Sequence, residues 1–332
     1  MRKVIVTGGS GFIGQAVVRH LVAEGFEVAT LARTPHSTSE SPGVHQFSGD
    51  IADLDFLNNA FVGIDTVIHL AAKTGIWGRK EDFFKTNVIG TQNVLAACKQ
   101  CGVSALVFAS TPSVVFDKND LCGINERTPY SHNYLCHYTH SKSIAEGLAL
   151  AANSESLKVT VLRPNLVWGP GDTNLIPRLL GQARCSQLRR IGDGRNLVDV
   201  TYIDNAADAF VLAAKRLHES DDPAGKVYFI SQGEPVNLWN WINKFFRRLD
   251  LPVVERRLSF SRAYYWGMLT EACYSLFRIK KEPCMTRFLA VQLARSHWFS
   301  IENAIRDLGY TPKVTTADGI NRVVDWVKNS SI

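Results

Sequence analysis

The stretch TGGSGFIG, residues 7–14, follows a short apolar segment and precedes a segment with helical periodicity. Its glycines fit both G-x-G-x-x-G spacing, read from Gly9, and G-x-x-G-x-x-G spacing, read from Gly8. Such glycines permit a tight turn and let the backbone approach a pyrophosphate, while the following helix offers free N–H groups and its positive dipole end. Strand, loop and helix in this order predict a dinucleotide site; the alternative is an ordinary glycine-rich turn. The predicted cofactor contacts are Gly8, Gly9, Ser10, Gly11, Phe12, Ile13 and Gly14.

Outward from this loop, strand-like and helix-like segments alternate through the first half of the chain. The expected strands cover residues 3–7, 27–31, 44–49, 65–70, 105–110 and 158–163, and the expected helices residues 12–24, 83–101 and 138–152. Strands that alternate with helices form βαβ units, whose right-handed crossovers build a parallel sheet. We therefore predict an α/β fold with a Rossmann-type doubly wound parallel sheet and a smaller, mostly helical C-terminal substrate domain.

The pattern loosens after Pro164, where a Gly-Pro-Gly turn follows at residues 169–171. A helix is expected over 205–216 and a strand that rejoins the sheet over 227–231, whereas 238–332 reads as mostly helical. We predict a dinucleotide-binding domain over 1–168, to which 200–233 returns. The substrate-binding domain then covers 169–199 and 234–332.

Composition and charge narrow the class of protein. The chain has 332 residues, 45% hydrophobic and 20% charged, which is ordinary for a globular protein. Residues 1–150 carry 12 Lys/Arg against 13 Asp/Glu, and the remainder 25 against 18, so the second half holds the positive charge and favours an anionic substrate or a membrane surface. We find no nucleic-acid recognition motif. The chain lacks an export signal and an apolar run long enough to span a bilayer, so we expect a cytoplasmic protein.

The seven cysteines lack metal-site spacing. Cys98 and Cys101 form one Cys-x-x-Cys pair inside an expected helix, and no second Cys/His pair completes a zinc site. We expect buried or reduced thiols and no metal.

The end of the second expected strand bears on the choice of dinucleotide. NAD sites place an acidic residue about 20 residues beyond the glycine loop, where it binds the ribose 2′-hydroxyl. Here that position reads Leu31-Ala32-Arg33-Thr34. A guanidinium suits a 2′-phosphate, which a carboxylate would repel. We predict a preference for NADP(H), with Arg33 as the clamp and NAD(H) as the other cofactor; the alternative is a solvated surface arginine.

Tyr138 and Lys142 in the sequence YTHSK lie one helical turn apart. A free tyrosine has a pKa near ~10, and a nearby lysine cation favours the phenolate. A lowered pKa would make Tyr138 a general acid toward a carbonyl oxygen, with Lys142 also bonding a cofactor ribose. The alternative is an ordinary surface pair on a helix.

The fifth expected strand ends in FASTPSVVF, residues 108–116, with three hydroxyl groups. Strand ends at the carboxyl edge of a doubly wound sheet face the ligand crevice. One hydroxyl there could donate to the substrate oxygen: Thr111 by position, with Ser110 as the alternative. Pro112 and Ser113 lie beside them as candidate substrate contacts.

Together these motifs resemble the extended short-chain dehydrogenase/reductase family over nearly the whole chain. The resemblance implies cofactor contacts from Asp50 and Ile51 beside the adenine, from Leu70, Ala71 and Ala72 in HLAA, from Asn87 in TNVIGT, and from Pro164, Asn165 and Val167 in LRPNLVWGPGD. It also implies that Tyr138 and Lys142 are the catalytic pair and that Thr111 replaces the usual catalytic serine.

Within that family the chain looks most like the 3β-hydroxysteroid dehydrogenase branch, notably in residues 286–312. AAKTGIWG, YTHSKSIAE and GDGRNLVDVTYIDNAADA resemble bacterial members that reduce, with NADPH, 3-oxo acids bearing a 2-alkyl chain. The alternative is a 3β-hydroxysteroid or sterol dehydrogenase. Leu197 stands where sugar-nucleotide epimerases tend to place an arginine, which argues against that class, and an intact Tyr/Lys pair argues against a non-catalytic NADP-binding regulator. The resemblance also implies that this chain forms a homodimer.

The sequence says less about the substrate-binding residues than about the cofactor site. Apolar residues recur at helical spacing within 262–281, flanked by Arg262 and Lys281. This segment either caps an apolar pocket, lies on a membrane surface, or packs as an ordinary helix. Lys73, Gly75 and Trp77 follow the fourth strand as candidate pocket residues, and Arg184 or Arg189 could meet a substrate carboxylate. We expect a small apolar keto acid or a steroid-like substrate, with membrane or multi-enzyme contact as open alternatives.

Overall fold

The computed structural model describes residues 1–34, 43–185 and 188–330. Its centre is a sheet of seven strands in the order β12-β7-β5-β4-β1-β2-β3, and all neighbours in it run parallel. The strands are β1 (Lys3–Thr7), β2 (Glu27–Ala32), β3 (Val44–Ser48), β4 (Thr66–His69), β5 (Ala105–Ala109), β7 (Lys158–Pro164) and β12 (Val227–Ile230). The predicted α/β doubly wound sheet is confirmed.

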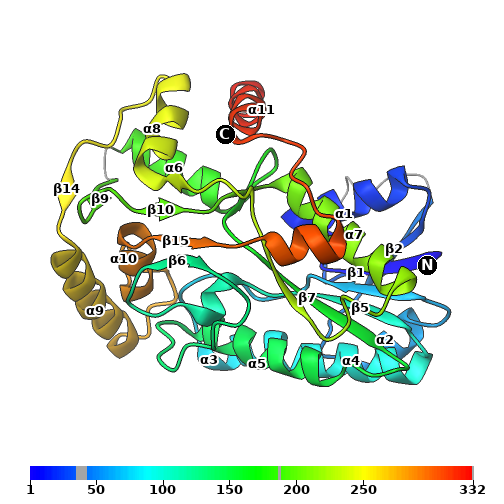
Figure 1. The fold of residues 1–332 in the computed structure, drawn as a ribbon. Helices are drawn as coiled ribbons and strands as arrows, with labels where there is room; N and C mark the ends of the chain where they lie inside the picture. Colours follow the sequence, from blue (N-terminus) through cyan, green and yellow to red (C-terminus); the bar gives the residue numbers. More distant parts are fainter. Residues whose placement is uncertain (35–42, 186–187, 331–332) are drawn as a thin grey trace.

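Helices cover both faces of the sheet (Figure 1). One apolar layer joins alternate residues of the strands to α1 (Phe12–Ala23) and α7 (Ile203–Glu219), and the opposite layer joins the others to α2 (Leu54–Ala60), α4 (Gly90–Cys101) and α5 (His137–Ala151). Because each central strand is buried on both sides, it reads as a continuous apolar run rather than an alternating one.

The helix expected over 83–101 is interrupted. It consists of α3 (Lys80–Phe84), a π-helical turn (Lys85–Ile89) and α4. The π turn contains Asn87, which is buried. Such turns insert one residue into a helix and often mark functional sites.

The second half forms a cap over one end of the sheet. Its helices are α6 (Leu175–Arg184), α8 (Leu238–Arg248), α9 (Phe260–Leu276), α10 (Arg287–Ala294) and α11 (Thr316–Asn329), with a π turn (Ala304–Leu308). A small sheet in the order β13-β10-β15-β6 joins β13 (Val236–Asn237), β10 (Leu197–Val198), β15 (His297–Phe299) and β6 (Leu121–Ile124). Two further pairs are β8 (Val167–Trp168) with β11 (Thr201–Tyr202) and β9 (Arg190–Ile191) with β14 (Arg257–Leu258).

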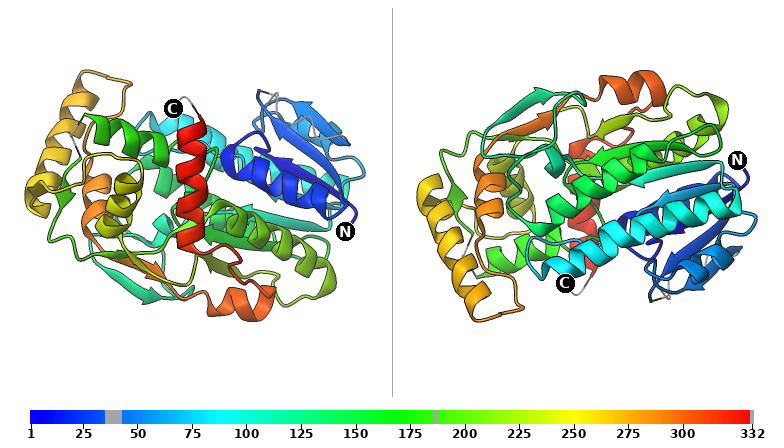
Figure 2. Two further views of the ribbon diagram at one scale, coloured as in Figure 1. Left: turned by 90° about the horizontal axis from the view of Figure 1, so that it is seen from above. Right: turned by 90° about the horizontal axis from the view of Figure 1, so that it is seen from below.

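The C-terminal region is mostly helical, as expected, although residues 331–332 of that prediction lie outside the described residues. The strand predicted over 227–231 does return, as β12, to the edge of the large sheet beside β7. The proposed division into two domains stays a prediction. In two further views, α9 lies at the end of the molecule opposite the N-terminus (Figure 2). Among the described helices, none is long and apolar enough to cross a bilayer.

Candidate active site

The glycine loop leaves β1 and enters α1 through a turn that only small residues can form. Gly8 adopts a positive φ of 73°, and its N–H donates to the carbonyl oxygen of Leu31 on β2 at 2.7 Å. A Cβ on Gly14 would collide with the Gly8 carbonyl oxygen, and one on Gly9 would lie 2.7 Å from the Thr30 side chain. These glycines therefore allow α1 to start directly against the ends of β1 and β2.

The start of α1 suits an anionic group. Gly11 is the N-cap residue and supplies no side-chain cap, and the first turn contains no acidic residue. Gly11 is exposed, and the atom nearest to a Cβ built on it would be the Gly8 carbonyl oxygen at 3.2 Å. The N–H groups of the first turn thus face an open surface with the positive end of the helix dipole, which fits a pyrophosphate.

The neighbouring strand ends carry the residues predicted for the adenosine side. Arg33 is exposed just after β2, and its carbonyl oxygen accepts a hydrogen bond from Ser48 Oγ at 3.4 Å. Asp50 is exposed after β3, and its Oδ1 accepts from the N–H of Ala52 at 3.0 Å. Ile51 is buried against Gly90 of α4, so it forms part of the floor rather than an exposed wall.

The end of β4 is fixed by a buried chain of hydrogen bonds. His69 Nδ1 lies 2.6 Å from Thr7 Oγ1, and His69 Nε2 lies 3.1 Å from Thr91 Oγ1. Burial first, and then the charge of Lys142, lower the pKa of His69 to about 3, so the ring is neutral. The predicted contacts Leu70, Ala71 and Ala72 follow directly, and the N–H of Ala71 donates to Thr7 Oγ1 at 3.3 Å.

Asn87 fastens the next loop to α5. Its Oδ1 accepts from the N–H of Lys73 at 2.7 Å, and its Nδ2 donates to the Lys73 carbonyl oxygen at 3.0 Å and to Ser141 Oγ at 2.9 Å. Ser141 in turn donates to the Tyr138 carbonyl oxygen at 2.8 Å. Asn87 therefore sets the position of the helix that carries Tyr138; Ser141 was not identified from the sequence.

Tyr138 and Lys142 both lie in the first half of α5, as predicted. The Tyr138 hydroxyl hydrogen-bonds with the side chain of Thr111. Lys142 is buried; its Nζ donates to the carbonyl oxygen of Ala109 at 2.6 Å and lies 4.2 Å from the Phe108 ring centre. The pair thus faces the carboxyl end of β5.

The structure corrects the predicted pKa of the tyrosine. Burial, followed by the nearby Cys136, raises the pKa of Tyr138 to about 12 instead of lowering it, although the hydrogen bond from Thr111 opposes the rise. Burial also lowers the pKa of Lys142 to about 7, against the attraction of Glu146. Lys142 is therefore only partly protonated near pH 7, where Tyr138 is a neutral phenol.

Ser110 and Thr111 have different partners. Ser110 donates to Glu146, which also accepts from Tyr130 Oη at 2.8 Å and from Arg163 Nε at 3.1 Å. Thr111 instead contacts both Ser113 Oγ, at 3.2 Å, and the Tyr138 hydroxyl, and its one proton can be donated to either of them. Of the two hydroxyl groups, Thr111 is the one beside the phenol.

The buried Glu146–Arg163 pair was missed by sequence reasoning. Glu146 is fully buried and Arg163 is 3% exposed, and a second bond joins Arg163 Nη2 to Glu146 Oε1 at 2.5 Å. The available signal was a glutamate four residues after Lys142 in an apolar stretch and an arginine within a buried strand.

The segment after β7 is held from the second half. Asn165 Nδ2 donates to the Asp199 carbonyl oxygen at 3.0 Å, and the Asn165 carbonyl oxygen accepts from Thr201 Oγ1 at 2.6 Å. Leu166 between Asn165 and Val167 has a positive φ of 40°, a strained conformation for a branched side chain and one that concentrates at functional sites. Pro164 ends β7.

A cleft of about 1310 Å³ lies beside the start of α5. Its walls come from the loop 73–82, from residues 134–140 and from α9 and Arg287. Of the candidate substrate contacts, Lys73 and Trp77 line this cleft, whereas Gly75, Pro112 and Ser113 are absent from its described lining, and their contact with a substrate stays a prediction. Thr111, Tyr138 and Lys142 are also absent from that lining. Trp77 Nε1 donates to the Ile279 carbonyl oxygen at 3.1 Å, which ties the loop to the end of α9.

The cleft wall is both apolar and cationic. Its basic members are Lys73, Arg79, Lys80, Arg278, Lys280 and Arg287. Its acidic members are Glu81, Asp82, which pairs with Arg79 at 2.8 Å, and Glu271, which pairs with Arg287 at 2.6 Å. Six cations therefore face three anions around the cleft. His137 lines it one residue from Tyr138. Arg184 and Arg189 are not part of this described lining.

A metal centre is not evident in the described part of the chain, where no three His, Cys, Asp or Glu residues are placed to hold an ion. All seven cysteines are free thiols.

A glycine loop on a doubly wound parallel sheet, with a Tyr/Lys pair at the end of β5, defines an oxidoreductase of the extended short-chain dehydrogenase/reductase class. The chain belongs to the 3-beta hydroxysteroid dehydrogenase/isomerase family, whose family model matches residues 5–260. It is an NAD(P)-dependent oxidoreductase.

Relatives with a described activity cover the whole length of the chain. The 2-alkyl-3-oxoalkanoate reductase of Stenotrophomonas maltophilia is 44% identical over 323 residues, 97% of this chain and 98% of that protein. A sterol-4-alpha-carboxylate 3-dehydrogenase (decarboxylating) of Mus musculus is 31% identical over 328 residues, 97% of this chain and 90% of that protein. Among solved structures, MoeE5 in complex with UDP-glucose and NAD has a TM-score of 0.76 and 27% identity, covering 98% of this chain and 99% of that one.

Proposed function

We propose that this chain reduces the ketone of a 2-alkyl-3-oxoalkanoate to the 3-hydroxy acid, with NADPH as the preferred reductant. The observation that carries the proposal is the Thr111–Tyr138 contact, made by the same helix whose His137 and His140 line a cleft of about 1310 Å³. The 44% identity to a 2-alkyl-3-oxoalkanoate reductase over the full chain supports this substrate class.

In this mechanism the glycine loop would hold the dinucleotide, which when bound would supply a hydride to the carbonyl carbon. Tyr138 arrives as a neutral phenol, because its pKa is about 12, and donates its proton to the carbonyl oxygen as negative charge develops there. Thr111 would turn its one hydroxyl proton from Ser113 Oγ to the phenol oxygen and so stabilise the phenolate that remains, and the ammonium of Lys142 would do so electrostatically. Water then returns the proton to Tyr138.

The cleft suits the substrate in size and character. Apolar groups such as Ile76, Leu135 and Met268 can pack against alkyl chains, and the excess of cations can attract a carboxylate. Arg184 and Arg189, the sequence-based candidates for the carboxylate, lie outside the cleft lining, so we assign that role to the cleft cations instead.

The NADPH preference rests on Arg33. Its exposed side chain follows β2, where position 32 is an alanine rather than an acid. A guanidinium there can bond a 2′-phosphate bidentately, and no carboxylate at that position repels it. Residues 35–42, which come next, lie outside the described residues.

The proposed activity can be tested with purified protein, NADPH and a racemic 2-alkyl-3-oxo acid, followed by the loss of NADPH absorbance. We expect cofactor oxidation that depends on the keto acid. A parallel assay with 3β-hydroxysteroids, sterols and oxidised cofactor tests the alternative suggested by the sterol dehydrogenase relative. Turnover of sterols with none of the keto acid would contradict the proposed substrate.

Tyr138→Phe should lower kcat by about 10²–10⁴ because the proton donor is lost, while cofactor binding survives. Tyr265→Phe is the matched control, since Tyr265 is exposed on α9 and should retain wild-type kcat. A Tyr138→Phe enzyme with full kcat would refute the assigned acid.

Arg33→Ala should reduce the ratio of kcat/KM for NADPH over NADH by about tenfold or more, because a charge-assisted hydrogen bond to the 2′-phosphate is removed. The expected change is in KM for NADPH alone. Arg79→Ala, an exposed arginine on the cleft loop, should leave the cofactor ratio unchanged. An unchanged ratio in Arg33→Ala would remove the assignment.

A further inference from the structure

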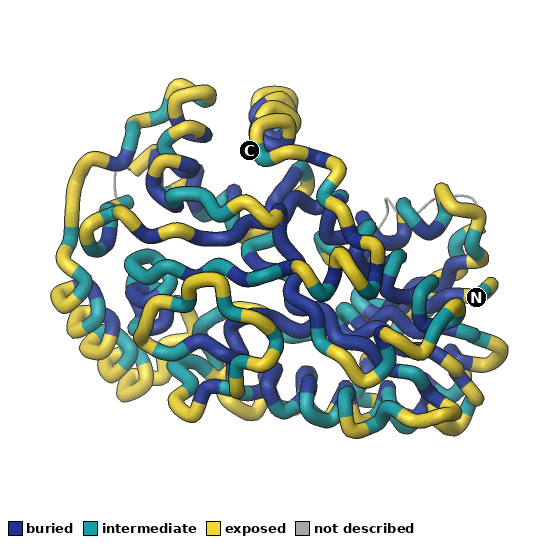
Figure 3. Tube along the Cα trace, in the orientation of Figure 1, coloured by how far each residue is buried: buried dark blue, intermediate teal, exposed yellow. Residues whose placement is uncertain are grey.

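The outer surface of α9 and the residues after it is unusually apolar. We call it the α9 face and define it by Tyr265, Trp266, Met268, Leu269, Leu276, Phe277 and Ile279. These seven belong to the eleven large hydrophobic side chains that are exposed in the described chain, and Leu269, Leu276 and Phe277 are 62%, 77% and 71% exposed. Along α9 the trace is largely exposed (Figure 3). A contiguous exposed patch of this kind marks an interaction site.

The geometry of α9 explains how this surface arises. Tyr265, Leu269, Ala272 and Leu276 recur at spacings of four, three and four, so they form one stripe along the helix. On the opposite side, Ala263 and Gly267 are buried, and a Cβ on Gly267 would collide with the backbone at Thr286–Arg287. A helix that is apolar around most of its circumference is expected to be covered on all sides. Here α10 covers one side and the stripe is left open.

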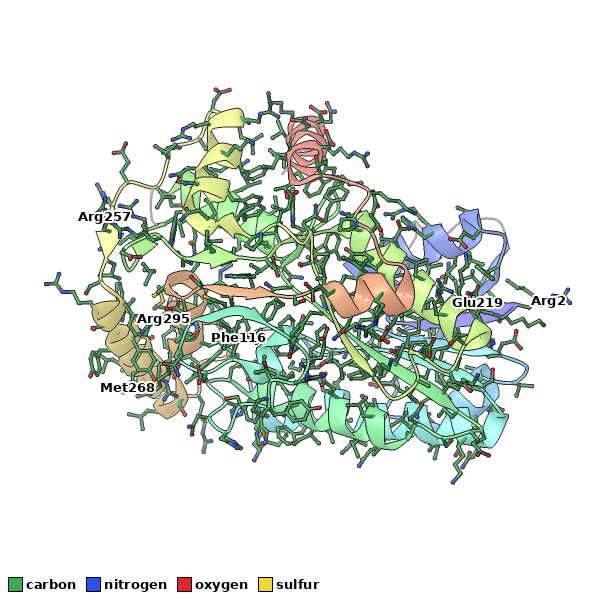
Figure 4. All side chains as sticks on the ribbon, in the orientation of Figure 1. Arg2, Phe116, Glu219, Arg257, Met268 and Arg295 are labelled. Carbon is green, nitrogen blue, oxygen red and sulfur yellow. The ribbon has the colours of Figure 1, made fainter. Side chains whose placement is uncertain are left out.

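Cations outnumber anions at the ends of the α9 face, where Glu255 stands before it and Glu282, which pairs with Arg178 at 2.6 Å, stands after it. Glu271 is the acidic residue of α9, and it is turned inward, accepting from Arg287 N–H at 2.7 Å and Arg287 Nε at 2.6 Å. Exposed cations stand at both ends: Arg257 and Arg262 before the stripe, and Arg278 and Lys281 after it. In the described chain none of these four forms a salt bridge. Arg257 and Met268 lie on the same edge of the molecule (Figure 4).

We propose that the α9 face docks onto an anionic lipid bilayer, with α9 lying in the plane of the interface. Apolar and aromatic side chains between cationic ends match such a surface, because the apolar groups enter the boundary region and the cations meet lipid phosphates. Tyr265 and Trp266 are side chains that favour the interface. A second copy of this chain fits less well, because a twofold contact would bring the cationic ends of two α9 faces together.

Docking would also place the cleft at the membrane. Met268 of the α9 face and Ala272 of the stripe also line the cleft, together with Ser275, whereas Tyr265, Leu269 and Leu276 are absent from its described lining. The cleft and the proposed bilayer contact therefore adjoin along one edge of α9. Delivery of a long-chain keto acid along this route rests on the proposed function, but docking itself does not.

The test is flotation of the full chain with vesicles, without substrate or cofactor. Vesicles of phosphatidylglycerol and phosphatidylcholine in equal amounts are compared with pure phosphatidylcholine. We expect binding to the anionic vesicles that weakens as salt is raised. Leu269→Ser with Leu276→Ser should lower the partition coefficient at least about tenfold. Val62→Ser with Ile305→Ser, two exposed apolar positions elsewhere, should leave it unchanged.

Charge-reversal variants distinguish the electrostatic contribution to vesicle binding from the apolar contribution. Arg278→Glu with Lys281→Glu should lower the partition coefficient about tenfold or more, whereas Arg127→Glu with Lys328→Glu, exposed cations away from α9, should not. Equal binding to neutral vesicles, no binding to anionic ones, or an equal loss in the control pairs would overturn the proposal. A dimer that Leu269→Ser with Leu276→Ser dissociates, in a chain that ignores vesicles, would assign the face to a second copy instead. Keto-acid turnover in solution is measured separately, so the two proposals can fail independently.

Discussion

The glycine loop and the cleft bind by different means. At the loop, backbone N–H groups and a helix start form the site, and Gly8, Gly9 and Gly14 are needed because a side chain would collide there. At the cleft, side chains from three segments far apart in sequence, 73–82, 134–140 and 268–287, form the walls. A site made of backbone leaves a spacing that can be read in one short stretch, whereas a site made of side chains depends on how distant segments meet.

The ion pair Glu146–Arg163, between α5 and β7, is buried, whereas the ion pair Glu271–Arg287 at the cleft is partly exposed. This difference in burial gives the largest expected effect on stability. Glu146→Ala should cost about 3–5 kcal/mol of unfolding free energy, because it strands the buried Arg163 and unpairs Ser110 and Tyr130. Glu271→Ala at the cleft should cost about 1 kcal/mol, because Arg287 is 38% exposed and can be hydrated. Urea unfolding of both variants checks this. Equal losses would mean that burial does not separate the two regions.

The sequence predicted well where the signal is local. The strands of the sheet, the loop at residues 7–14 and the positions of Tyr138 and Lys142 follow from short-range periodicity and spacing. The pairing of β6 with β15 joins residues more than 170 positions apart, and two- to four-residue strands carry no periodicity to read. The interruption of the helix over 83–101 was missed for another reason: Asn87 bonds to Lys73 and Ser141, contacts that exist only in the folded chain.

In the candidate active site, too, local features could be predicted and contacts between distant residues could not. Proximity of Tyr138, Lys142 and a hydroxyl could be expected from the order of elements, but the choice between Ser110 and Thr111 depends on the Glu146 contact. The direction of the Tyr138 pKa was also wrong from sequence, because spacing suggested a nearby cation but could not show burial, which is the largest cause of the raised pKa.

Glycine substitutions should have opposite effects in the glycine loop, where a side chain does not fit, and in α6, where it does. Gly14→Ala should weaken dinucleotide binding by roughly ten- to a hundredfold, about 1–3 kcal/mol, because the new Cβ collides with the Gly8 carbonyl oxygen and moves the start of α1. Gly181→Ala in α6 meets no atom within 4 Å and should instead stabilise the fold by about 0.5–1 kcal/mol. Fluorescence titration with NADPH and thermal unfolding measure the two effects. Unchanged affinity in Gly14→Ala would mean that the loop does not hold the cofactor as described.

The smallest expected effect is on the pH dependence of stability, which should differ between an ion pair on the large sheet and one in the C-terminal half. On the sheet side, His20 of α1 bridges to α7, with Nδ1 2.8 Å from Asp208 Oδ1 and Nε2 3.7 Å from Asp204 Oδ1. Hydrogen bonds to Asp204 and Asp208 raise the pKa of His20 from 6.5 to about 9. The folded chain therefore holds the His20 proton more tightly than the unfolded chain does. The interaction of His20 with the two aspartates stabilises the fold fully below about pH 6.5, and this stabilisation is lost as the pH rises through about 9.

His20→Asn should therefore cost about 1 kcal/mol at pH 6 and almost nothing at pH 9.5. In the C-terminal half, Arg178 of α6 pairs with Glu282 at 2.6 Å. Because an arginine stays charged between pH 6 and pH 9.5, Arg178→Gln should lower the free energy of unfolding by the same amount at both pH values. Urea unfolding at pH 6 and pH 9.5 measures both differences. A His20→Asn cost that is the same at both values would mean that His20 is neutral in the fold and that α1 and α7 are held by packing alone.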